Sequence, residues 1–336
     1  MYYQFFGISK NPFNMTPDPE FLYLTSQHRE ALAGLTYAIL GQKGFLVLTG
    51  EAGTGKTTLL QKVLQHLPPS RIKSSVILNP TLTAAEFLEM ALLDFGISEV
   101  PTSKAQRLVM LQQLLVKADD EKRICALIVD EAHKLSAEVL EEIRLLGNFE
   151  RSDHKLLQIL FLGQNELGDL LNRPDLRQLK QRVAARFSIG ALADAEVELY
   201  IGYRWKKAGG KQGAPFSAES LDRIIRFSKG IPRVINAICD NALIQAFGEG
   251  ASAVEASHVL ESCLALDLVS PSRPVPPATP PTAAPPTVAP PTALPTVPLS
   301  PNAPAPLSLP SLDRYRDRAP SRSLFARWVQ KLHLAN

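Results

Sequence analysis

The sequence predicts an α/β protein with a parallel sheet flanked by helices, followed by a smaller all-helical part. Over the first 190 residues, short apolar runs alternate with helical patterns, and from about residue 192 only helical patterns follow. Short apolar runs between helices are typical of buried parallel strands, because crossover helices cover both faces of such a sheet. A proline-rich stretch after residue 270 marks a tail that cannot build a packed core.

Each element is predicted from its own local pattern. The four predicted strands are the apolar runs Phe45–Thr49, Ser75–Leu78, Ile124–Val129 and Leu157–Leu162. Helices are expected to begin at Thr83 and Ser103, because Glu86 and Gln106 follow three residues later and complete capping boxes. The later helices are predicted at Asp194–Ala208, Ser217–Ser228, Pro232–Phe247 and Val254–Leu266.

The composition is that of a globular protein and excludes a wholly disordered chain. The 336 residues are 45% hydrophobic and 21% charged, which is enough to bury a core. Cys125, Cys239 and Cys263 lie far apart, which argues against a disulfide framework or a cysteine zinc site. Since the sequence shows neither a signal peptide nor a transmembrane segment, the expected location is the cytoplasm.

A glycine-rich motif follows the first predicted strand and opens a predicted helix. Residues 50–57, GEAGTGKT, match G-x-x-x-x-G-K-[ST], the pattern of a phosphate-binding loop. Glycines let backbone N–H groups close around a phosphate, and the helix N-terminus adds partial positive charge. Lys56 is expected at the β- and γ-phosphates. The residues expected to bind the nucleotide are Gly50, Glu51, Ala52, Gly53, Thr54, Gly55, Lys56, Thr57 and Thr58.

Two carboxylates end the third predicted strand. Asp130 and Glu131 follow an apolar run, and ligands of parallel α/β sheets bind at the carboxyl ends of strands. Asp130 and Thr57 are therefore the expected Mg²⁺ ligands, and Glu131 is expected to polarise the attacking water. The sequence Asp-Glu-Ala-His also spells a helicase box, but no second helicase core follows, so His133 is interpreted as a helix-start residue.

With these motifs, several later residues resemble those of an AAA+ ATPase, a P-loop NTPase with ATP and Mg²⁺ as cofactors. They are Gln164 after the fourth strand, Arg182 in Leu-Lys-Gln-Arg-Val, and Arg233 in Gly-Ile-Pro-Arg. The opening segments, which run from Phe6 to Phe13, from Thr16 to Tyr23 and from His28 to Leu32, are similar to those of the ExeA/GspA-type secretion ATPases. The resemblance covers about residues 1–268.

The resemblance implies further site residues and an oligomer. By analogy, Gln164 would be sensor 1, which contacts the γ-phosphate or the attacking water, and Arg233 would be sensor 2, which reaches the phosphates from the lid. Arg182 would be the arginine finger. Asn79 would restrain Glu131. An arginine finger acts on a neighbouring subunit, so the resemblance implies a homo-oligomer with active sites at subunit interfaces. Arg186 remains an alternative to Arg182, and Asn79 could equally be a turn residue before Pro80.

Four regions are predicted along the chain. They are an AAA+ P-loop domain with an N-terminal linker segment (1–190), a helical lid domain (191–268), a disordered Pro-rich linker (269–322) and a short basic amphipathic segment (323–336). The stretch from Pro271 to Pro310 holds 16 of the 27 prolines and favours an extended polyproline II spacer. Ser323–Leu334 carries an apolar helical face with Trp328, and it is expected to dock on a protein partner, a membrane surface or its own body.

The charge distribution bears on the choice of partner. Seven basic and two acidic residues follow residue 270, so the tail carries +5 and, since the whole chain carries +3, the first 270 residues carry −2. A body without basic excess does not favour nucleic acid as the partner. The favoured function is an ATPase that drives assembly or remodelling of a secretion or envelope complex, with peripheral recruitment to the inner membrane through the tail.

Alternative functions remain open. One is a DNA-binding ATPase of the transposition-helper or origin-recognition kind, and another is an ATPase of an exopolysaccharide or protein-sorting locus. A nucleotide-switch scaffold without hydrolysis is less favoured, because Glu131 and Arg182 are both in place. Larger ExeA/GspA-type proteins continue into a membrane helix and a peptidoglycan-binding domain that this sequence does not show. The resemblance is therefore expected to predict the ATPase activity of this protein better than a role in secretion.

Overall fold

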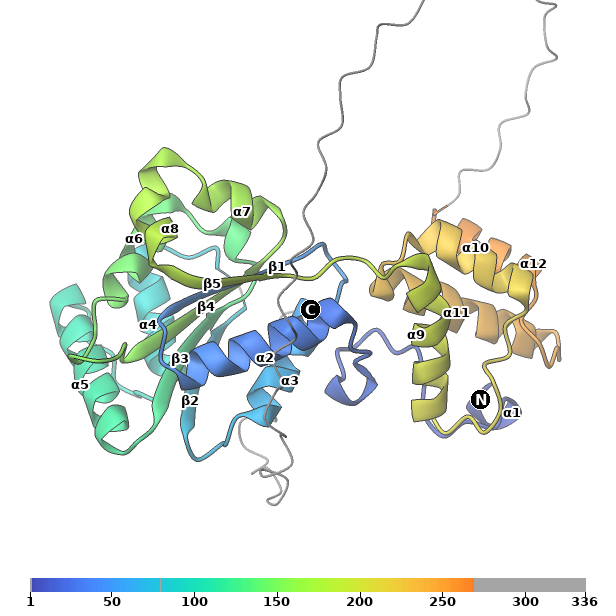
Figure 1. Cartoon of the computed structure of the whole chain (residues 1–336), viewed down its shortest axis with the longest axis horizontal. Coiled ribbons are helices and arrows are strands. Elements are labelled where there is room, and N and C mark those ends of the chain that lie inside the picture. Colours follow the sequence, from blue (N-terminus) through green and yellow to red (C-terminus); the bar gives the residue numbers. More distant parts are fainter. Residues whose placement is uncertain (1, 79, 269–336) are drawn as a thin grey trace, which may run out of the picture. The chain divides into compact units, whose positions relative to one another are not determined.

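The computed structural model of the chain describes residues 2–78 and 80–268 (Figure 1). Its strands form one parallel sheet in the order β2-β3-β4-β1-β5. The strands are β1 (Phe45–Thr49), β2 (Ile72–Ile77), β3 (Ile124–Val129), β4 (Leu157–Gly163) and β5 (Val183–Ser188). The predicted α/β fold with a parallel sheet is confirmed.

Helices flank the sheet and continue after it. Around the sheet they are α2 (Ser26–Leu40), α3 (Lys56–His66), α4 (Ala84–Asp94), α5 (Lys104–Asp120), α6 (Ala137–Leu146), α7 (Glu166–Leu171) and α8 (Arg177–Arg182). Before and after them lie α1 (Tyr2–Phe5), α9 (Asp194–Lys207), α10 (Ala218–Ser228), α11 (Pro232–Gly248) and α12 (Ala256–Ala265). Short 3₁₀ turns cover Pro19–Phe21, Ala132–Lys134 and Pro174–Leu176.

Each face of the sheet carries its own hydrophobic core. Successive side chains of a strand point to opposite faces, so β1 gives Leu46 and Leu48 to the core under α2 and α3. Val47 belongs to the other core, which is covered by α4, α5 and α6 (Figure 1). Every residue of β3 and β4 is buried. The parallel strand order places the carboxyl ends of β3, β4 and β1 side by side along one end of the sheet.

The fifth strand, β5, was not predicted. Its residues alternate between half-buried and exposed positions, as expected of an edge strand with one covered face, so it lacks the apolar run that marks the other strands. Phe187 of β5 packs against α2, where a Cβ on Gly34 would lie only 2.2 Å from its ring. The strand was therefore missed because half of its side chains face away from the core.

Both predicted helix starts are present, but only one of the two predicted capping boxes is formed. At Thr83 the capping box is formed, because Glu86 accepts the Thr83 backbone N–H at 2.8 Å and Thr83 Oγ1 accepts that of Glu86 at 3.3 Å. The capping box predicted at Ser103 is wrong: the helix begins there, but the Ser103 side chain makes no capping hydrogen bond. The second strand also begins three residues earlier than predicted, at Ile72.

The helices after the sheet share a core with the N-terminal segment. Tyr2, Phe13 and Phe21 are buried together with side chains of α9, α10, α11 and α12. Arg204 of α9 is almost fully buried, and its Nη1 donates a hydrogen bond of 3.2 Å to the carbonyl of Phe21. The domain boundaries remain predictions, and those for the linker and tail lie outside the described residues.

Two expectations from composition can be checked on the described part of the chain. Cys125, Cys239 and Cys263 are free and buried, as expected of reduced thiols. Within residues 2–78 and 80–268, no helix combines the length and apolar character needed to cross a membrane.

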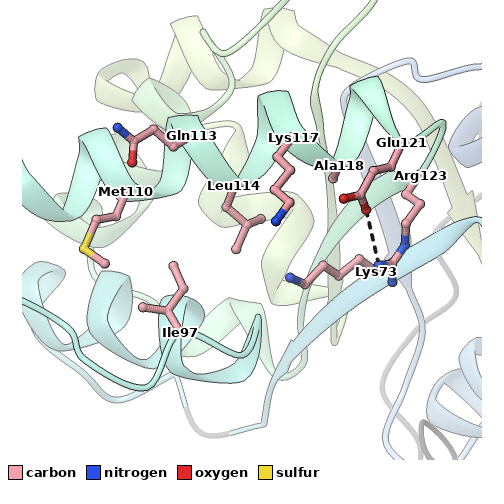
Figure 2. A pocket seen from close by; sticks show the side chains of 9 residues that line it. All are labelled: Lys73, Ile97, Met110, Gln113, Leu114, Lys117, Ala118, Glu121 and Arg123. Atoms are coloured by element: carbon pink, nitrogen blue, oxygen red, sulfur yellow. Dashed lines mark ion pairs between the residues drawn. The ribbon is translucent and has the colours of Figure 1, made fainter.

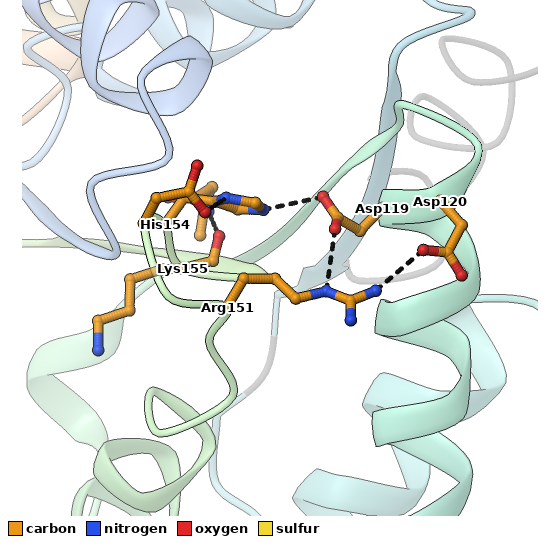
Figure 3. Close-up of polar contacts among 7 residues, drawn as sticks. Asp119, Asp120, Arg151, His154 and Lys155 are labelled. Carbon is orange, nitrogen blue, oxygen red and sulfur yellow. Dashed lines mark hydrogen bonds and ion pairs between the residues drawn. The ribbon is translucent and has the colours of Figure 1, made fainter.

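A polar cluster connects the loop before β4 to the end of α5 (Figure 3). The nitrogens of His154 lie 2.9 Å from an Asp119 oxygen and 2.7 Å from an Asp153 oxygen, and Arg151 binds Asp119 and Asp120. Burial lowers the pKa of His154, but the hydrogen bonds and charges of Asp119 and Asp153 outweigh burial and raise the pKa above its ordinary value. Protonated His154 therefore stabilises the folded chain.

We expect the His154→Gln variant to lose more stability at pH 6 than at pH 8. A pKa that is higher in the folded state than in the unfolded state stabilises the fold below the unfolded value of about 6.5. That contribution disappears as pH rises through the folded pKa. Partly exposed pairs of this kind contribute about 0.2–1 kcal/mol each. Urea unfolding at both pH values measures the effect, and an equal loss at pH 6 and pH 8 would contradict it.

Candidate functional site

The loop between β1 and α3 adopts a shape that depends on its glycines. Gly53 and Gly55 have φ angles of 82° and 99°, in the left-handed region that side chains disfavour. Lys56 is only 6% exposed, and its Nζ donates hydrogen bonds to the carbonyls of Gly50 at 2.7 Å and Glu51 at 2.9 Å. Burial lowers the pKa of Lys56, and nearby carboxylates partly offset this. The ammonium group is thus held beside the loop.

The two predicted Mg²⁺ ligands meet at the start of α3. Thr57 Oγ1 donates a hydrogen bond of 3.2 Å to an oxygen of Asp130, the residue that follows β3. Burial raises the pKa of Asp130 above its ordinary value, and a bound cation would favour the ionised carboxylate.

The donor set fits Mg²⁺ bound together with a nucleotide. In the described part of the chain, no group of three or more His, Cys, Asp or Glu residues could hold a metal alone. Mg²⁺ in nucleotide sites usually takes one or two protein ligands, with phosphate oxygens and water completing its shell. A single carboxylate next to a hydroxyl, at the end of a phosphate-binding loop, matches that requirement.

Glu131 lies beside Asp130 in a strained turn. Its φ of 52° is left-handed, a conformation that is uncommon outside glycine and often occurs at functional sites. Its carboxylate lies 3.3 Å from Lys134 Nζ and 3.6 Å from His133 Nε2. The turn thus places the side chains of His133 and Lys134 beside the Glu131 carboxylate.

Sequence reasoning missed the contacts of His133. Its Nδ1 accepts a hydrogen bond of 3.3 Å from the backbone N–H of Gln164, which directly follows β4. The side chain therefore lies between Glu131 and Gln164, the residues predicted to polarise water and to act as sensor 1. The helix-start interpretation of His133 gave no signal for this position, because the left-handed turn at Glu131 cannot be seen in residue spacing.

The N-terminus of α11 contacts the phosphate-binding loop. The backbone N–H of Arg233 donates a hydrogen bond of 3.2 Å to the carbonyl of Gly53. A Cβ on Gly53 would lie 2.6 Å from Cβ of Arg233, so the close approach requires glycine there. The structure thus brings residues 50–58, Asp130, Glu131, Gln164 and the backbone of Arg233 together, and the roles expected for these residues stay predictions.

Arg182 lies away from this group. It ends α8, directly before β5, and its Nη1 donates hydrogen bonds to the Asn148 side chain at 2.6 Å and the Arg144 carbonyl at 3.1 Å. Arg186 is exposed on β5. Asn79 lies outside the described residues, so its predicted contact with Glu131 stays a prediction.

A separate pocket lies at the end of the sheet opposite to the phosphate-binding loop. It has a volume of about 470 Å³, and Figure 2 shows Lys73 and Lys117 reaching into it beside Met110 and Leu114. Lys73 is the second residue of β2, so this pocket belongs to the amino ends of the strands. The phosphate-binding loop and the carboxylates lie at the carboxyl ends.

Comparison with known proteins gives one matching family model and one similar curated protein. Residues 39–171 match the family model of an AAA domain. General secretion pathway protein A of Aeromonas hydrophila is 43% identical over 255 residues, which cover 74% of this chain and 46% of that protein.

Two solved structures share the fold. The Aeropyrum pernix ORC2 protein in ADPNP–ADP complexes has a TM-score of 0.59, with 17% identity over 76% of this chain and 71% of that chain. The Cdc6p protein of Pyrobaculum aerophilum has a TM-score of 0.58, with 17% identity over 77% and 71%.

The fold and the matched domain define this chain as an AAA-type ATPase. Within that class it is similar to the ExeA/GspA-type ATPases, as the resemblance in its motifs implied. The chain spans about half the length of the secretion protein that it matches.

Proposed function

We propose that the protein binds ATP with Mg²⁺ and hydrolyses it to ADP and phosphate. The observation that carries this proposal is the hydrogen bond of 3.2 Å between Thr57 and Asp130. It joins the helix start of the phosphate-binding loop to the carboxyl end of β3, where Glu131 is the next residue. A carboxylate for the metal and a second one for water thus lie beside one phosphate-binding loop.

Each residue has a distinct part in the proposed reaction. The backbone N–H groups of residues 50–58 and the Lys56 ammonium bind the phosphates. Thr57 and Asp130 would hold Mg²⁺, which neutralises charge on phosphate oxygens when bound. Glu131 orients the attacking water and accepts its proton.

Three further side chains support the reaction from other elements. Gln164 is proposed to contact the γ-phosphate or the water, and Arg233 to reach the phosphates from α11. Arg182 is proposed to act on a neighbouring subunit in a homo-oligomer, because forked arginine donors stabilise the charge that spreads over the phosphoryl oxygens.

The proposed process is assembly or remodelling of a secretion or envelope complex. The relative named for general secretion supports this, and the −2 charge of the first 270 residues does not favour a nucleic-acid partner. A protein partner or a membrane surface, reached through Ser323–Leu334, is proposed as the point of recruitment. The segment lies outside the described residues.

We expect Lys56→Ala to weaken ATP binding. Hydrogen bonds to a charged group contribute about 1.5–3 kcal/mol, which corresponds to about a 10- to 150-fold loss of affinity. Isothermal titration calorimetry with Mg²⁺ and ATP measures this, and Lys62→Ala on the same helix is the matched control. If Lys56→Ala binds ATP as tightly as the control, the loop does not bind the phosphates.

A further inference from the structure

His28 connects the first turn of α2 to the phosphate-binding loop. Its side chain is only 2% exposed. One ring nitrogen, Nδ1, lies 2.7 Å from Thr25 Oγ1, and the other, Nε2, lies 3.3 Å from the carbonyl oxygen of Thr54. The function derived above uses neither of these contacts.

The two partners determine which ring nitrogen carries the proton. A carbonyl oxygen can only accept, so Nε2 of His28 must donate to Thr54. Nδ1 of the neutral ring then accepts from the Thr25 hydroxyl, whose oxygen in turn accepts the backbone N–H of His28 at 3.3 Å. Burial lowers the pKa of His28, which agrees with a neutral ring. Both nitrogens therefore have partners without any added charge.

The contact with Thr54 also fixes a peptide group of the loop. In a trans peptide the C=O and the next N–H point in opposite directions. Because the Thr54 carbonyl is held on the side of α2, the Gly55 N–H points away from His28. Gly55 caps α3 and directly precedes Lys56, so its N–H is one of the donors available to a phosphate.

This peptide group has little to hold it from within the loop. Gly53 and Gly55 flank Thr54, and glycine leaves backbone rotation nearly unrestricted. The Thr54 hydroxyl and backbone N–H both donate hydrogen bonds to the Glu51 carbonyl, but these bonds do not involve the Thr54 carbonyl. His28, which is buried on the separate helix α2, supplies the hydrogen bond to the Thr54 carbonyl.

We propose that His28 is a positioning residue of the nucleotide site, which holds the Thr54–Gly55 peptide so that the Gly55 N–H is aimed at the phosphates. The inference rests on the proposed nucleotide binding. It assigns no chemical step to His28. A donor arranged before the ligand arrives raises affinity because less ordering remains to be done on binding.

Paired amide variants test this proposal. The amide nitrogen of Gln reaches about as far from the backbone as Nε2 of histidine, whereas that of Asn ends near the depth of Nδ1. His28→Gln can therefore keep the donor to Thr54, and His28→Asn cannot. We expect His28→Asn and His28→Ala to bind ADP about two- to tenfold more weakly than wild type, and His28→Gln to stay close to wild type.

The measurements separate positioning from stability. Isothermal titration calorimetry on the full chain gives ADP affinity, and thermal unfolding with and without ADP gives the stabilisation by the nucleotide. His28→Asn and His28→Gln should unfold at similar temperatures without ADP, but ADP should raise that temperature less for His28→Asn. Equal ADP affinity of the Asn and Gln variants would overturn the proposal. A wild-type chain that binds no ADP would instead overturn the proposed nucleotide site.

Discussion

The Glu131→Gln variant should bind ATP with nearly the affinity of the wild type and lose about 10²- to 10⁴-fold in turnover, the usual contribution of a positioned general base. The amide has the size of the carboxylate, so the strained turn and the Asp130 contact with Thr57 need not change. It cannot accept the proton of the attacking water. This one variant should therefore keep ATP binding and lose ATP hydrolysis.

The expected result is measured as phosphate release at saturating ATP, alongside ATP affinity by calorimetry. Glu138→Gln is the matched control, because Glu138 is an exposed carboxylate in the first turn of α6. A Glu131→Gln chain that turns over as fast as Glu138→Gln would show that another group activates the water.

The parts of the site that sequence could predict are those with local signals. The phosphate-binding loop is one continuous motif between a strand and a helix, and Asp130 ends an apolar run. The meeting of Thr57 with Asp130 follows because β3 and β1 are separated only by β4 in a parallel sheet. Residues 73 positions apart thus come together through the strand order of the sheet, whereas the strand patterns predict only that the sheet is parallel.

The parts that sequence could not predict depend on unusual backbone or on distant packing. β5 was missed because an edge strand with alternating exposure has no apolar run. The contacts of His133 depend on the left-handed φ of Glu131. His28 reaches Thr54 across 26 residues, and no spacing rule connects the first turn of one helix to a loop that precedes another.

The position of Arg182 determines how it can act. Val183 is paired with Phe45, and Ser188 with Thr49, along parallel strands. Arg182 therefore stands at the amino end of β5, while the phosphate-binding loop follows the carboxyl end of β1. At about 3.3 Å per residue, five residues of strand separate the two ends by roughly 16 Å. This separation favours action on a neighbouring subunit over action on its own loop.

We expect Arg182→Ala to bind ATP normally and to lose about 10³- to 10⁵-fold in hydrolysis, the effect of arginine fingers on phosphoryl transfer. Arg186→Ala tests the alternative arginine, and Arg177→Ala, at the exposed start of α8, is the control. Loss of activity in Arg186→Ala alone would reassign the role to Arg186. Hydrolysis by the wild type should also rise with protein concentration, because the proposed site is complete only with an arginine from a neighbouring subunit.

Mixing two inactive variants gives the sharpest test of action between subunits. Where an Arg182→Ala chain receives its neighbour's arginine from a Glu131→Gln chain, the interface holds both an intact Glu131 and an intact Arg182. In a head-to-tail assembly, random mixing in equal amounts makes about a quarter of the interfaces complete. We therefore expect the mixture to recover up to about a quarter of wild-type activity, whereas each variant alone stays inactive. No recovery in mixtures that demonstrably co-assemble, or full activity of a monomer at high dilution, would show that Arg182 does not act across an interface.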